Sequence, residues 1–281
     1  MNKKYLILSK KDTSTLPLIK EVFEMLTKCG DEVYSVPERM DFFSNIPMKE
    51  LKSTDIPKLS GAISFGGDGT MLKAGRLLIG KDIPILGINL GHLGYLTDAE
   101  PEDAISSVKK FIEGNYTTES RYALEINIYG KTYYGLNEAD IYRGDLSHIM
   151  DIEVKINDQV AETIRADGII VATPTGSTAY NLSAGGPIVS PLSKTFILTP
   201  ICAHSLSSRP LVLDEKCQVS LKVSNFRAKD KPVLDVDGKN IAKLTENTVI
   251  NINISDKTIL FARTKPYNFF KTLRAKMTSK D

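Results

Sequence analysis

The first 118 residues alternate short apolar runs with segments of helical periodicity. The runs of strand type are Tyr5–Leu8, Glu32–Val36, Ala62–Phe65 and Ile83–Leu90. Apolar residues also recur every three or four positions around residues 16–26, 70–79 and 104–112, which is the spacing of an amphipathic helix. Strands that alternate with helices predict a parallel sheet covered on both faces, an α/β fold. In such sheets, ligands bind beyond the carboxyl ends of the strands.

From about residue 120 onward, the apolar period changes to two. Apolar and polar residues alternate in four stretches, at residues 124–128, 152–156, 219–223 and 250–254. The pairs Gly130-Lys131 and Asn157-Asp158 are of turn type and lie between such runs. This all-β half is therefore expected to be mostly antiparallel, with two packed sheets that form a β-sandwich.

The last stretch of the chain departs from that alternation. Its apolar residues return to helical spacing: Phe269, Phe270, Leu273 and Met277. The pattern predicts a final helix within Pro266–Met277 that returns to the first domain. We therefore expect an α/β domain over residues 1–118 together with 266–281, and a β-sandwich domain over residues 119–265.

The composition is that of an ordinary soluble globular protein, with 42% hydrophobic and 25% charged residues among 281. Basic residues exceed acidic ones by only two, 36 against 34, so the bulk charge gives no electrostatic footprint for DNA or RNA. No apolar run approaches the roughly 20 residues that span a bilayer. Met1–Leu8 fits a first strand better than a signal peptide. We expect a cytoplasmic protein without membrane association.

A glycine-rich pentapeptide, Gly66-Gly-Asp-Gly-Thr70, follows the third predicted strand directly. Because glycine has no Cβ, successive backbone N–H groups can converge on one anion. The helix that follows adds N–H groups without intrahelical partners. The loop residues interpreted as a phosphate site are Gly66, Gly67, Gly69 and Thr70. Asp68 is unusual there, because a carboxylate repels phosphate, and it indicates chemistry on a nearby hydroxyl or a metal. The alternative is a polar turn in which Asp68 caps the helix.

A second dense motif runs from Asp167 to Tyr180. A predicted strand, Ile169–Ala172, leads into a loop of small Thr, Pro, Gly and Ser residues, and Ser183-Ala-Gly-Gly-Pro187 follows. Small residues let a planar ligand lie against the backbone, and Tyr180 offers a ring for stacking. The alternative is a loop whose hydroxyl groups bond to their own backbone.

Two acidic motifs lie in the second half. Asn137-Glu-Ala-Asp140 falls between two β runs, and its amide and carboxylate side by side can recognise a base or a ribose. Taken alone, it more often marks a solvated strand end. Leu234-Asp-Val-Asp-Gly238 also ends a strand, and Asp237-Gly238 is expected to form a hairpin turn, with ligand contact by Asp237 as the alternative.

Several familiar sites are absent from the sequence. It contains neither a G-x-x-x-x-G-K-[ST] phosphate loop nor a G-x-G-x-x-G dinucleotide fingerprint, and the protein-kinase loop signatures are missing. No metal-ligand spacing is present. Three cysteines lie far apart, Cys29, Cys202 and Cys217, and they are expected to be reduced and partly buried.

Taken together, these motifs closely resemble the NAD kinase family. The shared elements are Gly66–Thr70, Gly91–Leu96, Asn137-Glu138, Thr173–Tyr180 with Ser183–Pro187, and Pro200–Pro210. The resemblance spans roughly residues 60 to 240 and includes the order of the two domains. It implies ATP-dependent transfer of a phosphoryl group to the 2′-hydroxyl of the adenosine ribose of NAD, with Mg²⁺ accompanying ATP. It also implies a homodimer or homotetramer with sites at subunit contacts.

The resemblance also implies a role for particular residues. Asp68 would orient and deprotonate the 2′-hydroxyl, while Asn137 and Glu138 would hold the adenine and ribose parts of NAD. Asp167 would complete the dinucleotide pocket, as a residue that a neighbouring subunit can contribute. The further residues of the implied NAD pocket are Gly69, Tyr95, Arg165, Thr178, Ala179, Tyr180, Ser183 and Asp237. Tyr95 stands where the family usually has Phe, which keeps the ring and adds a hydroxyl.

Two rival functions use parts of the same pattern. Lipid kinases of the diacylglycerol type share the Gly-Gly-Asp-Gly-Thr loop, but the Pro-x-Gly-Thr-x-Asn-Asp stretch that usually follows it is replaced here by Pro84–Gly91. A non-catalytic NAD(H)-sensing module would use the same pocket without transfer. The intact Asp68 argues against it, because binding alone needs no acid beside phosphates. ATP or polyphosphate as donor, and NAD or NADH as acceptor, are left open.

Overall fold

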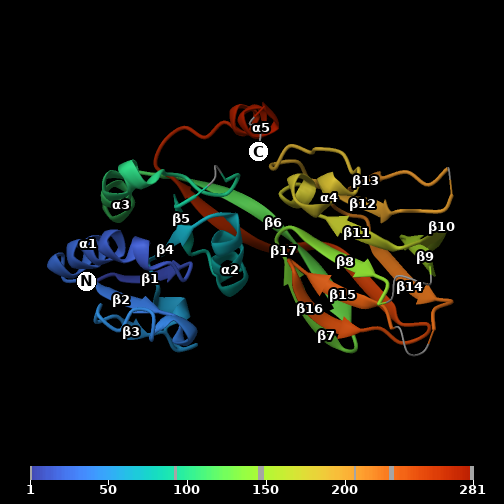
Figure 1. The fold of residues 1–281 in the computed structure, drawn as a ribbon, viewed down its shortest axis with the longest axis horizontal. Coiled ribbons are helices and arrows are strands. Elements are labelled where there is room, and N and C mark those ends of the chain that lie inside the picture. Colours follow the sequence, from blue (N-terminus) through green and yellow to red (C-terminus); the bar gives the residue numbers. More distant parts are fainter. Residues whose placement is uncertain (1, 92–93, 145–148, 206, 228–230, 279–281) are drawn as a thin grey trace. The chain divides into compact units, whose positions relative to one another are not determined.

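The computed structural model describes residues 2–91, 94–144, 149–205, 207–227 and 231–278. The chain divides into two compact units, one of Met1–Ser120 with Ile259–Asp281 and the other of Arg121–Thr258. Figure 1 shows helices packed around strands in the first unit and a strand-rich second unit. Two of the family-like segments include positions outside the described residues, namely 92–93 and 206.

The first unit contains the predicted parallel sheet. Its strands are β1 (Lys4–Ser9), β2 (Glu32–Ser35), β3 (Lys49–Glu50), β4 (Gly61–Gly66) and β5 (Pro84–Asn89). Neighbours follow the order β5-β4-β1-β2-β3, and each pair is parallel. The end of β17 (Val249–Arg263) adds a further parallel strand, with Leu260 opposite Pro84. That strand was not expected, because the period of two at residues 250–254 predicts only its first part.

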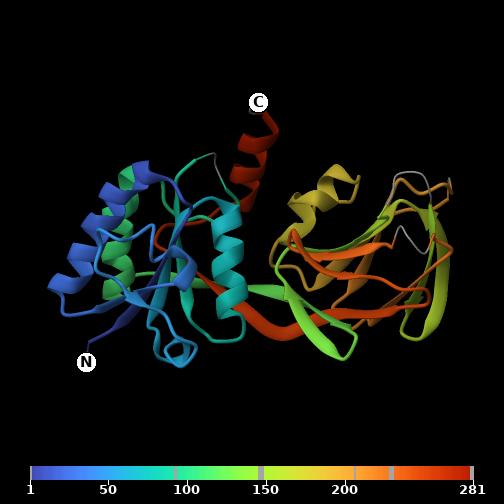
Figure 2. The ribbon, with the colours of Figure 1, turned by 60° about the horizontal axis from the view of Figure 1, so that its bottom comes forward.

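Helices cover both faces of this sheet, as the sequence predicts. They are α1 (Leu16–Lys28), α2 (Asp68–Leu78) and α3 (Ala104–Glu113). Strands β1 and β4 are neighbours in the middle of this sheet. The connection after β1 leads outward to β2, and the connection after β4 leads outward in the opposite direction to β5. Right-handed crossovers then place α1 and α2 on opposite faces, as Figures 1 and 2 show. The chain directions diverge between β1 and β4, and open α/β sheets bind their ligands at such a point.

The predicted apolar faces of these helices are buried. In α1 and α3 they pack on the strand residues Tyr5, Ile7, Ile63 and Phe65 in one core. Met71, Ala74 and Leu78 of α2 are fully buried as well. Gly87 of β5 lies so close to Met71 that a Cβ there would collide with the Met71 side chain. The first turn of α2, which contains Met71, thus packs closely on β5. This contact holds the N-terminus of the helix next to the end of β4.

The second unit is the predicted sandwich of antiparallel sheets. Its strands begin with β6 (Thr117–Ile128), β7 (Lys131–Gly135), β8 (Glu138–Tyr142), β9 (Met150–Ile156), β10 (Gln159–Ala166) and β11 (Gly168–Ala172). They continue with β12 (Thr195–Ile201), β13 (Leu211–Asp214), β14 (Val219–Ser224), β15 (Val233–Val236) and β16 (Lys239–Lys243). One sheet has the order β13-β12-β11-β8-β15-β16, and the other includes β10-β9-β14-β17 with β6 and β7.

Turns and core of this unit agree with the period-two pattern. Tyr129 and Gly130 join β6 to β7 with positive φ, one residue before the expected pair Gly130-Lys131, because Lys131 already belongs to β7. Asn157 and Asp158 join β9 to β10 as expected, also with positive φ. Asp237 and Gly238 form the expected hairpin turn between β15 and β16, again with positive φ. Alternate residues of both sheets meet in one core, for example Ile152 and Leu221 of one sheet with Ile169 and Leu234 of the other.

Three expectations need correction. Asn137–Asp140 is no solvated strand end: Glu138 opens β8, an interior strand of the six-stranded sheet, and is only 6% exposed. Cys29 and Cys202 are exposed rather than partly buried. The final helix, α5 (Phe269–Thr278), is present but buries none of its residues fully, and Phe270 of the expected apolar stripe is 66% exposed.

The loop after β11 is also more regular than its composition suggests. It contains a 3-10 turn, Gly176–Thr178, followed by the short helix α4, Tyr180–Ser183.

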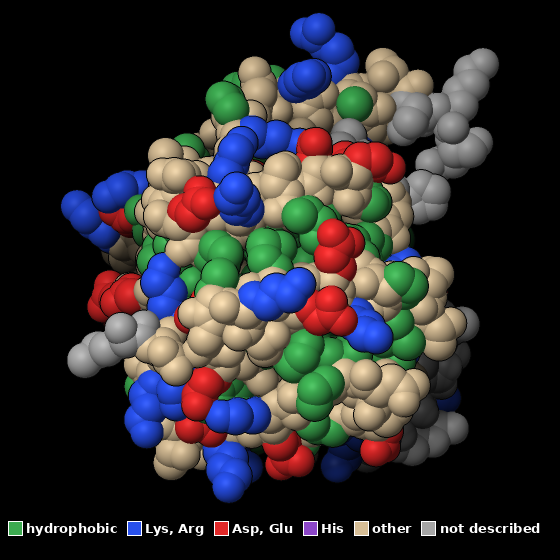
Figure 3. Space-filling model, turned by 90° about the vertical axis from the view of Figure 1, so that its left-hand side faces the viewer, with side chains coloured by type: hydrophobic (Ala, Val, Ile, Leu, Met, Phe, Trp, Pro, Cys, Tyr) green, Lys and Arg blue, Asp and Glu red, His purple; other side chains and the backbone are tan. Residues whose placement is uncertain are grey.

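Within the described ranges, no helix is long and apolar enough to cross a membrane. On the face drawn in Figure 3, basic and acidic side chains are interspersed among apolar ones.

Candidate functional site

Asp68 is the first residue of α2 and lies at the carboxyl end of β4. Its carboxylate accepts two backbone hydrogen bonds from the segment after β5, one from Tyr95 N–H to Oδ2 and one from Leu96 N–H to Oδ1, both of 2.9 Å. The side chain is 30% exposed. Two N–H donors fix the direction of the carboxylate and leave lone pairs for another donor. An orientated, accessible carboxylate of this kind can accept a proton from a bound hydroxyl group.

Glycines shape the space on both sides of this carboxylate. A Cβ on Gly94 would collide with Asp68 Oδ1 and Thr97 Oγ1, so glycine permits the close approach of the 94–97 segment. In contrast, a Cβ on Gly67 or Gly69 would meet no described atom within 4 Å. These two glycines therefore border open space at the N-terminus of α2, where backbone N–H groups and the helix dipole favour an anion.

Thr70 is placed differently from its expected role in the loop. It is 8% exposed, and its N–H donates to Gly67 O at 2.9 Å. A Cβ on Gly66 would collide with the Thr70 side chain. Gly66 and Thr70 thus pack against each other behind the loop, whereas Gly67 and Gly69 face its open side.

In the second unit, two of the predicted motifs come together. Thr173 donates its N–H to Asn137 O at 2.8 Å and its hydroxyl to Leu136 O at 2.5 Å. Gly176 approaches the Asn137 backbone so closely that any Cβ would overlap it. The small residues of the loop therefore serve first to bring it against the start of β8. Asn137 itself is half-buried at this junction.

Asp237 anchors the same junction from the β15–β16 turn. Its Oδ2 accepts the N–H of Leu136 at 2.9 Å, and its Oδ1 accepts the N–H of Asn137 at 2.7 Å and of Glu138 at 3.2 Å. The carboxylate thus binds three consecutive backbone groups. Its position supports a role in holding Asn137 and Glu138 in place more than direct ligand contact.

Glu138 belongs to a buried group of acids on β8 and β15. Asp140 lies opposite Asp235 in the strand pair, and Asp140 is 7% exposed. Burial, with the nearby charges of Asp140 and Asp237, raises the pKa of Glu138 to about 8. Burial, with Asp235 and Asp237, raises the pKa of Asp140 to about 7. Near neutral pH, Glu138 is therefore mostly protonated and can donate as well as accept a hydrogen bond.

Three further predicted NAD-binding residues of the second unit are Arg165, Asp167 and Tyr180. Asp167 forms an ion pair with Arg143 at 3.0 Å, whereas Arg165 is exposed and pairs with Asp151 at 2.9 Å. Arg165 and Asp167 therefore have different partners despite their sequence proximity. Tyr180 is 45% exposed, and partial burial together with Asp140, Cys202 and Asp167 raises its pKa.

Thr178, Ala179 and Ser183 complete the loop. The Thr178 hydroxyl makes a long bond of 3.4 Å to Thr175 O, so its own backbone does not hold it firmly. Ala179 N–H donates to Gly176 O, and Ser183 is exposed at the end of α4. Both Thr178 and Ser183 thus leave hydroxyl groups available to a ligand.

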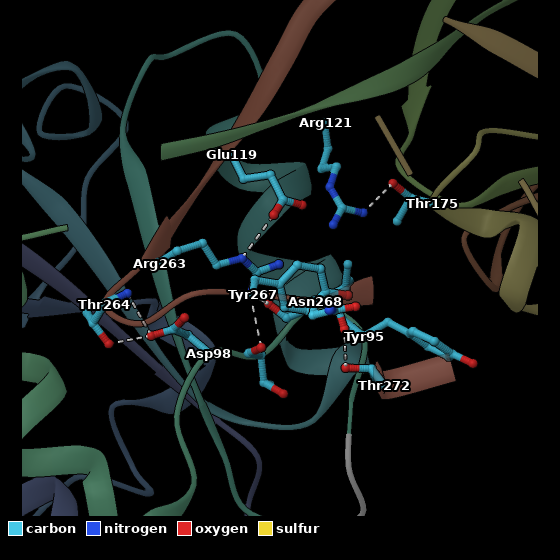
Figure 4. A network of polar contacts seen from close by, with 12 residues as sticks. Tyr95, Asp98, Glu119, Arg121, Thr175, Arg263, Thr264, Tyr267, Asn268 and Thr272 are labelled. Atoms are coloured by element: carbon cyan, nitrogen blue, oxygen red, sulfur yellow. Dashed lines mark hydrogen bonds and ion pairs between the residues drawn. The ribbon is translucent and has the colours of Figure 1, made fainter. Parts of the chain in front are cut away.

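Three basic residues near these sites do not belong to any of the motifs found in the sequence. In the second unit, Arg121 is 1% exposed and donates to Thr175 Oγ1 at 3.1 Å (Figure 4). In the first unit, Arg263 donates to the carbonyls of Leu96 and Thr97 and forms an ion pair with Glu119 at 3.2 Å. Lys276, also in the first unit, lies 4.0 Å from Asp68.

Arg263 supports the backbone that holds Asp68. Its guanidinium also lies 4.0 Å from the centre of the Tyr267 ring, and the Tyr267 hydroxyl donates to Tyr95 O at 2.9 Å. Figure 4 shows these side chains converging on the segment that contains Tyr95. The carbonyl groups of residues 95–97 thus accept hydrogen bonds from Arg263 and Tyr267, while the N–H groups of Tyr95 and Leu96 bind the Asp68 carboxylate.

A metal site does not emerge from the side chains alone. Within the part of the chain that the structure describes, no three His, Cys, Asp or Glu side chains are grouped so as to hold a metal ion. Glu138 and Asp140 of β8 have raised pKa values because they are buried beside other acids.

Comparison with known proteins gives a consistent result. The family model of the ATP-NAD kinase N-terminal domain matches residues 5–116, and that of the ATP-NAD kinase C-terminal domain matches residues 136–264. An NAD kinase from Sulfurimonas denitrificans is 34% identical over 280 residues, which covers 92% of this chain and 97% of the relative. One from Caldicellulosiruptor saccharolyticus is 38% identical over 256 residues, covering 90% of this chain and 95% of the relative.

Solved structures agree in fold over the whole chain. Yeast NADH kinase complexed with NADH has a TM-score of 0.88 and 25% identity, and the match covers 100% of this chain and 89% of that one. An NAD kinase from Archaeoglobus fulgidus in complex with ATP has a TM-score of 0.78 and 26% identity, with coverage of 99% and 100%.

An acid held at the start of a helix that follows a glycine loop, in an α/β unit followed by a β-sandwich, fits a phosphotransferase that acts on an alcohol group. The matched domains and relatives make the class more specific. The chain belongs to the ATP-NAD kinase family, and its activity is that of an NAD kinase.

Proposed function

We propose that Asp68 accepts the proton of the 2′-hydroxyl of NAD's adenosine ribose while the γ-phosphoryl group of ATP is transferred to that oxygen. The observation that supports this role best is the double N–H clamp on the Asp68 carboxylate, beside the open space at Gly67 and Gly69. The clamp fixes the base before the substrate arrives. Catalysis of phosphoryl transfer depends mainly on such positioning and on charge neutralisation.

A bond forms between the ribose O2′ and the γ-phosphorus, and the bond from that phosphorus to the β–γ bridging oxygen breaks. The hydroxyl proton moves to Asp68, and the bridging electron pair leaves with ADP. NADP is the other product. Because the transition state is loose, the proton transfers late, and a carboxylate within hydrogen-bond reach is sufficient as the base.

ATP would bind at the glycine loop. The backbone of Gly67 and Gly69 would contact its phosphate oxygens, with Gly66 and Thr70 as support behind the loop. A divalent cation, Mg²⁺ in our proposal, would be bound to the triphosphate, since Mg²⁺ prefers phosphate and water oxygens and retains several waters. Its chemistry is to offset the triphosphate charge. The accessible oxygens of Asp68 suit contact with such a hydrated ion.

NAD would bind to the second unit. Asn137 and the protonated Glu138 would contact its adenine and ribose parts, and Tyr180 would stack on a planar ring. Asp167, Thr178, Ala179 and Ser183 would complete the pocket, with Asp237 as the support of Asn137 and Glu138. Tyr95, beside Asp68, and the exposed Arg165 are assigned more peripheral contacts.

We further propose a cytoplasmic homodimer or homotetramer in which a neighbouring subunit supplies Asp167. Exposed apolar side chains in the second unit support an oligomer, since Tyr180 and Leu182 lie on α4 and Val212 lies on β13. Strand β13 is at one end of the six-stranded order, and such an edge offers unpaired backbone groups to a partner.

One assay separates this function from its rivals. The protein is incubated with ATP, Mg²⁺ and NAD, and any NADP is measured with an NADP-specific dehydrogenase. NADP formation supports the proposal. NAD binding without NADP would indicate a sensor, and phosphorylation of diacylglycerol alone would indicate a lipid kinase. Replacing ATP by polyphosphate, and NAD by NADH, identifies the preferred donor and acceptor.

A further inference from the structure

The C-terminal helix brings positive charge to Asp68. The stretch of residues 265–278 contains four basic residues and no acidic one. One of the four, Lys276 in the last turn of α5, places its Nζ 4.0 Å from Asp68 Oδ2. The same Nζ lies 4.4 Å from the centre of the Tyr95 ring, a distance at which a cation and an aromatic face attract. The Lys276 side chain is 33% exposed, so a ligand can still reach it.

Aromatic contacts hold α5 in this place. The Tyr267 hydroxyl, just before the helix, donates to Tyr95 O at 2.9 Å. The rings of Phe269 and Tyr95 lie 6.0 Å apart, centre to centre. Tyr95 also donates its N–H to Asp68. The residue that helps to fix the candidate base is therefore the residue on which the C-terminal helix docks, and Lys276 arrives as part of a packed structure.

An ammonium at this position matches what phosphoryl transfer requires. The phosphates of ATP would lie at Gly67 and Gly69, on the open side of the loop, and the transferred group must pass Asp68. Both the phosphates and the Asp68 carboxylate are negative, so the site needs a cation between them. A basic residue in a last helical turn also stabilises the helix dipole, but that purely structural role needs no approach to Asp68.

We propose that Lys276 is a further catalytic residue, whose ammonium binds the terminal phosphate oxygens of ATP beside Asp68. It forms and breaks no covalent bond and keeps its protons throughout; it neutralises charge on the group in transfer. This inference rests on the proposed role of Asp68 and adds the C-terminal helix to the donor site. The ligand chemistry is a triphosphate, recognised by a flexible point charge.

The test compares Lys276→Met and Lys276→Arg with Lys271→Met. Lys271 is exposed on the same helix and gives a matched loss of one positive charge. For Lys276→Met, kcat should fall and KM for ATP should rise, with kcat/KM for ATP at least about tenfold lower, the usual size of effect for a lost charge-assisted hydrogen bond. KM for NAD should stay within about twofold. Lys276→Arg should recover part of the loss, and Lys271→Met should match the parent.

Binding of inorganic tripolyphosphate, measured by titration calorimetry, gives a readout that does not need turnover. Lys276→Met should weaken it about tenfold, whereas Asp68→Asn, which removes a negative charge, should leave it equal or stronger. Unchanged tripolyphosphate binding in Lys276→Met, or kcat equal to or above that of the parent, would overturn the proposal. If the parent itself formed no NADP but bound tripolyphosphate through Lys276, the proposed function would fail while the phosphate site would stand.

Discussion

The Asp68 carboxylate keeps one orientation because the backbone on the opposite loop, not a side chain, holds it. Tyr95 and Leu96 donate the two bonds, and Gly94 allows their approach. The sequence predicted the strand and the helix on either side of this acid, because strand, glycine loop and helix follow one another directly. It could not predict the clamp, since backbone donors leave no trace in residue type. The contact between Lys276 and Asp68 could not be predicted for another reason. Some 200 residues separate the two in the sequence, and only the fold brings them together.

The open space at Gly67 leads to a prediction for Gly67→Ala. Its φ of −101° suits alanine, and the new methyl group would meet no described atom within 4 Å, so we expect a loss of stability no greater than about 1 kcal/mol. The methyl group would occupy space assigned to a phosphate. KM for ATP should therefore rise by about tenfold or more, the cost of a lost hydrogen bond to a charged group.

Steady-state kinetics with varied ATP and varied NAD check this prediction, because KM for NAD serves as the internal control. A Gly67→Ala variant that folds normally and has an unchanged KM for ATP would place the donor phosphates elsewhere.

At the scale of elements, the strand β8 departs most from its sequence pattern. The sequence around its acids is typical of a solvated strand end, yet the strand lies in the interior of a sheet. The acids are buried because Asp237 and the loop of Thr173 and Gly176 enclose the start of the strand. By contrast, strands β1, β4 and β11 are continuous apolar runs and were predicted closely. The pattern of apolar residues in the sequence predicts which of them are buried. The burial of acids depends on tertiary contacts, which the sequence pattern does not show.

The buried acids of β8 make stability depend on pH. The pKa of Glu138 is raised to about 8 in the folded protein from an ordinary value of 4.5. Its stabilising contribution is therefore complete below about pH 4.5 and is lost as pH rises through about 8. Glu138→Gln cannot ionise, so its melting temperature relative to the parent should rise between these values and level off above them.

Thermal unfolding in the absence of nucleotides, from pH 4.5 to 9, measures that difference. Asp256→Asn, which removes a carboxylate at an exposed position of the same unit, is the control for loss of one acidic group. A Glu138→Gln difference that stays flat or declines with rising pH would show that the carboxyl group ionises normally in the fold.

At the scale of the whole molecule, the change of apolar period from helical to two predicted an α/β part followed by an all-β part, and both are present. The long strand β17 was only half predicted, because its last part is apolar without alternation where it joins the parallel sheet. The proposed subunit association has no clear pattern in the sequence, because exposed apolar residues such as Val212 resemble ordinary strand residues there.

The proposed oligomer predicts a solution mass of two or four times 31.0 kDa, measurable by light scattering after size-exclusion chromatography. Val212→Asp places a charge on the exposed edge strand β13 and should lower that mass, because a buried unpaired charge destabilises an interface. A parent protein of 31.0 kDa at assay concentration would contradict the oligomer and the sharing of Asp167 between subunits.

The most direct measurement concerns Asp68→Asn. Asparagine preserves the size of the side chain and keeps one oxygen for the N–H groups of Tyr95 and Leu96, so the fold and the affinity for NAD should persist. Loss of a general base typically lowers turnover by about 10²–10⁴-fold. NADP formation should therefore fall at least about 100-fold at saturating ATP, Mg²⁺ and NAD, with NAD binding by calorimetry unchanged. Turnover within about tenfold of the parent would contradict the assignment of Asp68 as the base.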